Sequence, residues 1–161
     1  MPNFPSLMPG MMPGSNPRLR RLEMQCDRTF QTVDAEAMAI VDLPLDQVKT
    51  NAKARLAAWR FAQETNGTTL PDGTKLLTDR DTQDALNRIL NSLDRGLVTP
   101  PVTYKGVDGW GELSKAQLTA IAGVVATHVQ TCWAAERDAS DQVDAAASLD
   151  AVRSILATAG A

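Results

Sequence analysis

The feature that most constrains the fold is a proline-free run from Ser114 to Ala146. Ser114 is followed three residues later by Gln117, which is the pattern of a capping box at a helix start. Apolar residues then recur at every third or fourth position and form one stripe: Leu118, Ile121, Ala122, Val125, Val129 and Cys132. The sequence therefore predicts one long helix over residues 114–146.

Three further helices are predicted around this one. Over residues 44–66, Pro44 suits the first turn and Gly67 the residue past the end. The apolar face of that helix contains Leu45, Val48, Ala52, Leu56 and Trp59. A helix over 79–95 has Thr78 or Asp79 as its cap and Gly96 after its end, with a face of Leu86, Ile89, Leu90 and Leu93. Ser148 caps a last short helix that carries Leu149, Val152, Ile155 and Leu156.

Two short hairpins are predicted between the helices. Residues 68–77 contain Pro71-Asp72-Gly73, whose preset φ, side-chain acceptor and tolerance of positive φ favour a tight turn. After Pro100-Pro101, the segment from Val102 to Tyr104 is expected to pair with the segment from Trp110 to Leu113 across the turn Lys105–Gly109.

Residues 18–43 form a less regular attachment segment. Leu22, Met24 and Cys26 alternate with polar residues, which predicts a strand near 19–26. The apolar spacing from Phe30 to Val41 suits a short helix better, and the rest of this segment is left open.

Residues 1–17 are expected to form an extended arm. Prolines at positions 2, 5, 9, 13 and 17 exclude a helix or a central strand. A solvated linker does not need the apolar residues of this arm, and methionine fills irregular grooves well. The predicted partner-binding residues of the arm are Phe4, Leu7, Met8, Met11 and Met12. The alternative is a disordered tail.

The predicted fold is thus mainly α: a small helical domain over 44–158, one or two short β-hairpins and the extended N-terminal arm. A hydrophobic content of 43% supports a packed core, whereas the net charge of −3 argues against a nucleic-acid partner. We expect no membrane partner either, because no run reaches the roughly 18 apolar residues of a membrane span. Cys26 and Cys132 fit free thiols, so synthesis in a reducing cytoplasm is expected.

His128 and Cys132 are the strongest candidates for chemistry, because a spacing of four residues puts both on one helix face. A zinc site needs about four ligands, and only Cys26 would add another strong one. A nucleophilic pair would also need an orienting acid and an oxyanion site. The acids near Asp79, including Asp81, suit helix capping better than calcium binding. We therefore expect no catalytic residue, no metal and no cofactor.

The three tryptophans are the largest side chains of the sequence. Trp59 and Trp133 lie on predicted helix faces and are expected in the core. Trp110 lies in a Gly-Trp-Gly turn, so it is the better candidate for an interface and the sixth predicted partner-binding residue.

From about Leu45 to Leu156, the order of these motifs resembles an uncharacterised domain family found in bacteriophage tail and tail-fibre proteins. The resemblance is carried by Thr78-Asp79-Arg80 with Gln83, by Trp110, and by the segments LSKAQLTAIAGVVATHVQTCWAAERDASDQVDAA and SLDAVRSIL. The resemblance implies that the chain is part of a phage tail, but it implies no chemical activity. Residues 1–43 lie outside it.

The sequence therefore predicts a non-enzymatic virion component of the tail tip, baseplate or fibre attachment region. Its expected partners are other phage tail proteins and further copies of itself in a symmetric assembly. The alternative is a tail or tail-fibre assembly chaperone that is absent from the mature virion. A third hypothesis is a small enzyme that uses His128 and Cys132.

Overall fold

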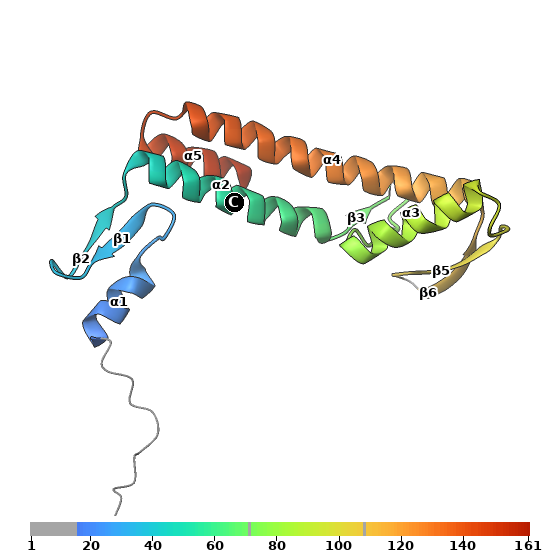
Figure 1. Cartoon of the computed structure of the whole chain (residues 1–161), viewed down its shortest axis with the longest axis horizontal. Coiled ribbons are helices and arrows are strands. Elements are labelled where there is room, and N and C mark those ends of the chain that lie inside the picture. Colours follow the sequence, from blue (N-terminus) through green and yellow to red (C-terminus); the bar gives the residue numbers. More distant parts are fainter. Residues whose placement is uncertain (1–15, 71, 108) are drawn as a thin grey trace, which may run out of the picture. The chain divides into compact units, whose positions relative to one another are not determined.

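The computed structural model describes residues 16–70, 72–107 and 109–161. This part of the chain is mainly helical, as predicted, with five helices and three antiparallel two-stranded sheets (Figure 1). That is one hairpin more than the sequence predicted. The apolar residues of the predicted arm, Phe4, Leu7, Met8, Met11 and Met12, lie outside the described residues. The chain divides into two compact units, residues 1–51 and 52–161, with the boundary inside helix α2 (Leu45–Thr65).

The first unit begins with helix α1 (Pro17–Gln25), so the predicted strand near 19–26 is wrong. The Asn16 side chain accepts a hydrogen bond from the Arg18 amide at 3.0 Å, and Pro17 occupies the first helical position, where its missing N–H is not needed. No residue of α1 is buried, and Met24 is 82% exposed. The alternating apolar residues therefore did not mark a buried face.

A hairpin of β1 (Gln31–Asp34) and β2 (Ala39–Asp42) follows, so the segment whose prediction stayed open does not form the short helix that the spacing from Phe30 to Val41 favoured. The Asp34 carboxylate accepts hydrogen bonds from the amides of Glu36 and Ala37, each at 2.9 Å. These local bonds favour a turn over a helix.

The second unit is organised along helix α4 (Lys115–Ala145), which confirms the predicted long helix. Its capping box is formed, since the Ser114 hydroxyl accepts from the Gln117 amide and the Gln117 side chain accepts from the Ser114 amide. The buried positions of α4 continue the predicted stripe toward the end of the helix: Leu118, Val125, Cys132, Ala139 and Val143.

Helix α2 runs antiparallel to the carboxyl-terminal half of α4. Lys53 binds Asp144 at 2.8 Å, and farther along α2, Arg60 binds Glu136 at 2.8 Å. Helix α5 (Leu149–Ala159), capped by Ser148 as predicted, also packs against α4 (Figure 1). This half of α4 is therefore covered by two helices.

Helix α3 (Arg80–Asp94) and a hairpin cover the other half of α4. The hairpin pairs β5 (Val102–Gly106) with β6 (Gly109–Leu113), with Val102 opposite Leu113, as predicted. The core between them contains Leu86, Leu93, Leu118 and Val125, with Leu76, Ile89, Leu90, Val102, Tyr104, Leu113, Ile121 and Val129 packed against it.

The hairpin predicted over 68–77 is present but short. It consists of β3 (Thr68–Thr69) and β4 (Lys75–Leu76). Asp72 accepts from the Thr74 amide at 2.9 Å, and Gly73 has a φ of 89°, as the turn chemistry predicted. Pro71 lies outside the described residues.

Among the helices of the described segments, α4 alone is long and apolar enough to cross a membrane by length and composition. No membrane-spanning segment was predicted from the sequence. A single helix of this kind says little about a membrane, because the core helix of a soluble protein meets the same criterion.

Replacing Leu118 by alanine tests the packing of α4. Leu118 is fully buried, so Leu118→Ala is expected to lower the free energy of unfolding by about 2–5 kcal/mol. Leu97→Ala is the matched control, because Leu97 is 66% exposed, and it should change stability by less than about 0.5 kcal/mol. Urea unfolding followed by tryptophan fluorescence measures both values. Equal losses would contradict this core.

Candidate functional site

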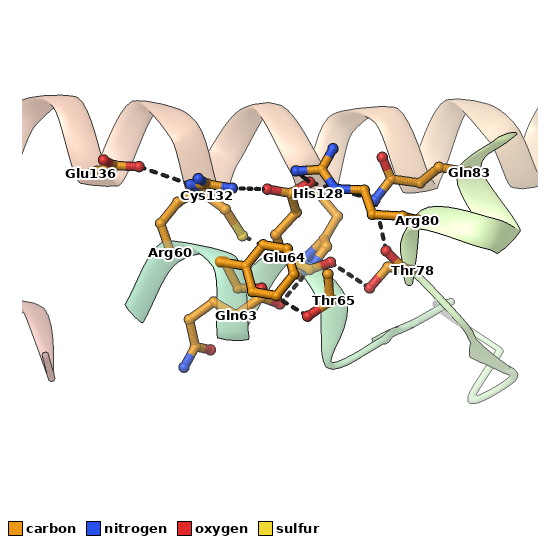
Figure 2. Close-up of polar contacts among 11 residues, drawn as sticks. Arg60, Gln63, Glu64, Thr65, Thr78, Arg80, Gln83, His128, Cys132 and Glu136 are labelled. Atoms are coloured by element: carbon orange, nitrogen blue, oxygen red, sulfur yellow. Dashed lines mark hydrogen bonds and ion pairs between the residues drawn. The ribbon is translucent and has the colours of Figure 1, made fainter. Parts of the chain in front are cut away.

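A group of linked polar side chains in the second unit surrounds Glu64, near the end of α2 (Figure 2). The Glu64 side chain is fully buried and forms ion pairs with Arg60, one turn earlier, and with Arg80 at 2.8 Å. Gln83 lies 3.5 Å from the same carboxylate. A buried carboxylate is stable only when paired and hydrogen-bonded, and both arginines meet that need.

Arg60 extends this group to α4. Its Nε donates to Glu136 at 2.8 Å, and its guanidinium lies 4.1 Å from the centre of the Trp133 ring. Burial acts against the charge of Arg60, but hydrogen bonds to Glu136 and Glu64 outweigh this effect and raise its pKa. Arg60 therefore stays charged and links two acidic residues on different helices.

The turn between α2 and α3 is tied to the same place. The Thr78 hydroxyl is buried and donates to the backbone carbonyl of Glu64 at 2.5 Å, while it accepts from the Gly67 amide at 2.9 Å. Gln83 donates to the Thr78 carbonyl at 2.7 Å. Gly67 has a φ of 90°, and a Cβ there would lie 2.9 Å from the Leu76 carbonyl oxygen, so only glycine fits.

Arg60, Glu64, Thr78, Arg80, Gln83 and Glu136 are named here the Glu64 network. Its four ions, Arg60, Arg80, Glu64 and Glu136, balance in charge. Within the described residues, no buried side-chain nitrogen or oxygen lacks a hydrogen-bond partner. The geometry of these contacts holds α2, α3 and α4 together.

His128 and Cys132 lie beside this network. The His128 Nε2 is 3.1 Å from the carbonyl oxygen of Gln63 and 3.8 Å from the Cys132 sulfur. A carbonyl only accepts, so in this bond Nε2 carries a proton and is not free to take one from the thiol. Burial, and then the negative charge of Glu64, raise the pKa of the Cys132 thiol. Both effects disfavour a thiolate nucleophile.

Metal ligands do not gather in the parts of the chain that the structure describes: no group of three or more His, Cys, Asp or Glu residues is placed to hold an ion. Asp79 instead caps α3, accepting from the Thr82 amide and hydroxyl, each at 2.9 Å. These hydrogen bonds lower the pKa of Asp79, so the carboxylate keeps its charge at the helix start.

The structure places the predicted interface residue Trp110 on β6, with its side chain 73% exposed and the Lys105 amine 5.5 Å from its ring. The expectation that Trp133 belongs to the core is wrong. Trp133 is 46% exposed, and its ring packs on the Arg60 guanidinium and not into the apolar core.

Sequence reasoning missed Glu64 and Arg60 as members of one network. The available signal was their spacing: the apolar stripe through Ala52 and Leu56 continues in steps of four residues to Arg60 and Glu64. Charged residues on a buried stripe need partners, and these partners come from distant segments.

Substitutions in the Glu64 network should destabilise the second unit in a fixed order. Glu64→Gln leaves two arginines without their shared charge and is expected to cost about 3–5 kcal/mol of unfolding free energy. Arg60→Ala should cost more than Arg80→Ala, because the Arg80 side chain is 52% exposed. Urea titration measures these losses. The control, Glu112→Gln on the exposed side of β6, should be nearly neutral, and an equal loss there would refute the role of the network.

Comparison with known proteins gives a family but no activity. No curated protein and no solved structure matches the chain significantly. The family model described as "Domain of unknown function (DUF4376)" matches residues 47–158, which include the whole Glu64 network and Trp110. The chain therefore belongs to the DUF4376 family.

Proposed function

We propose that this chain is a non-enzymatic structural component of a bacteriophage tail, in the tail tip, baseplate or fibre attachment region. It docks on neighbouring tail subunits through residues 1–15, the part of the predicted arm 1–17 that precedes the cap and first residue of α1, and through Trp110. The phage setting is supported by the resemblance of its motifs to domains of tail and tail-fibre proteins. Its location is then the virion, after synthesis in the host cytoplasm.

The observation that carries a docking role is the exposure of Trp110. An indole that is 73% exposed leaves a large apolar surface in water, which binding to a partner would remove. Leu77 and Val107 are exposed as well and line one depression beside β4, and Val107 lines a neighbouring groove with Trp110. A cluster of exposed apolar residues is typical of an interaction site, whereas isolated ones are not.

The Glu64 network supports a structural role and not a catalytic one. Its polar groups bind one another, and the thiol of Cys132 is buried and held as a neutral group. Such an arrangement stabilises a scaffold and offers little to a substrate. The net charge of −3 likewise favours protein partners over nucleic acid.

Deleting residues 2–15 tests this proposal. The deletion spares Asn16 and Pro17, which begin α1, so the described helices should keep their circular dichroism signal and unfolding midpoint. Incorporation into particles of the phage that encodes this chain should be lost, because the apolar arm is the expected attachment. Quantitative immunoblotting of purified particles measures it.

The matched control is the double substitution Asn3→Ala and Ser6→Ala, which keeps every apolar residue of the arm. This variant should enter particles normally. Normal incorporation of the deletion variant would reject docking through the arm.

A further inference from the structure

A groove runs between β4 and the β5–β6 hairpin in the second unit. It is lined by Leu76, Tyr104, Trp110, Leu113 and Ile121, among others. Four of these residues, Leu76, Tyr104, Leu113 and Ile121, also pack on the core of α3 and α4, so the floor of the groove is anchored. Trp110 also lines the groove and is 73% exposed.

The groove is apolar and aromatic, with Lys75 as the one ionisable cation among the lining residues that the structure describes. An occupant with many charges would lose hydration there without finding partners. The groove therefore suits an uncharged, apolar segment that can stack on Trp110 and Tyr104.

Residues 1–15 of this chain have that composition. They contain no Asp, Glu, Lys or Arg, and they include Phe4, Leu7 and four prolines. Proline has no N–H to donate, so such a segment is a poor strand for a sheet edge and a good ligand for an aromatic groove. At the three residues per turn of a polyproline II helix, Phe4 and Leu7 fall on one edge, and Asn3 and Ser6 on another.

The length of the segment also fits. Fifteen residues at about 3.1 Å each span roughly 46 Å in the polyproline II form. A five-residue strand such as β6 is about 17 Å long. Residues 1–15 can thus fill the groove and still cross to a neighbouring molecule.

We propose that residues 1–15 of one copy bind in the Trp110 groove of a second copy, so that the two predicted partner-binding elements bind each other. This inference rests on the proposed function, in which several copies assemble in one tail. The occupant of the groove is the arm of a second copy, so each exchanged arm links two subunits.

Photo-crosslinking of the full chain tests the proposal. Trp110 is replaced by p-benzoyl-phenylalanine in unlabelled protein, which is mixed with heavy-isotope-labelled wild-type protein and irradiated. After trypsin digestion, mass spectrometry should find peptide 106–115 of the unlabelled chain joined to the labelled peptide 1–18. The same probe at Leu97, which is exposed but outside the groove, should not give this product.

The double substitution Phe4→Ser and Leu7→Ser in the labelled chain should lower the yield at least about tenfold, because two buried apolar side chains are lost. Absence of arm crosslinks from position 110 would overturn the proposal. Crosslinks found only within one chain would overturn the assignment to a second copy. If deletion of residues 2–15 abolishes incorporation while position 110 gives no arm crosslink, the proposed function stands and this inference alone fails.

Discussion

The arrangement of the second unit depends on the buried carboxylate of Glu64. Removing such a charge from water costs several kcal/mol, so the fold is stable only where Arg60 and Arg80 both reach it. Those two arginines belong to different segments, and Arg60 also binds Glu136 on α4. The end of α2, the start of α3 and α4 at Glu136 are therefore held together at one point. Apolar packing alone would not fix these three helices in one relative placement.

Much of the second unit could be predicted from the sequence because its signals are local. The capping box at Ser114, the cap at Asp79 and the cap at Ser148 each act within a few residues, and each is formed. The pairing of β5 with β6 follows from a glycine-rich turn between two short apolar segments. Local hydrogen bonds and preset dihedral angles leave few alternatives at these places.

The remainder could not be predicted because it depends on contacts far apart in sequence or on small local differences. Around α1, the spacing of Leu22 and Met24 suggested a strand, but the cap at Asn16 and Pro17 at the first position begin a helix there. The partners of Glu64 come from α2 and α3, and no spacing rule identifies Arg80 as one of them. Trp133 was misplaced because its ring covers a charged group whose position depends on the same network.

The buried Glu64 network and the exposed Trp110 of the second unit support the proposed role as a subunit of an assembly. The most direct test of that account is quantitative mass spectrometry of purified phage particles, with this chain measured against the tail tube protein. A fixed whole-number ratio is predicted, because a structural subunit occupies symmetric positions. Absence from the particles, with abundance in the infected cell, would contradict the account and favour an assembly chaperone.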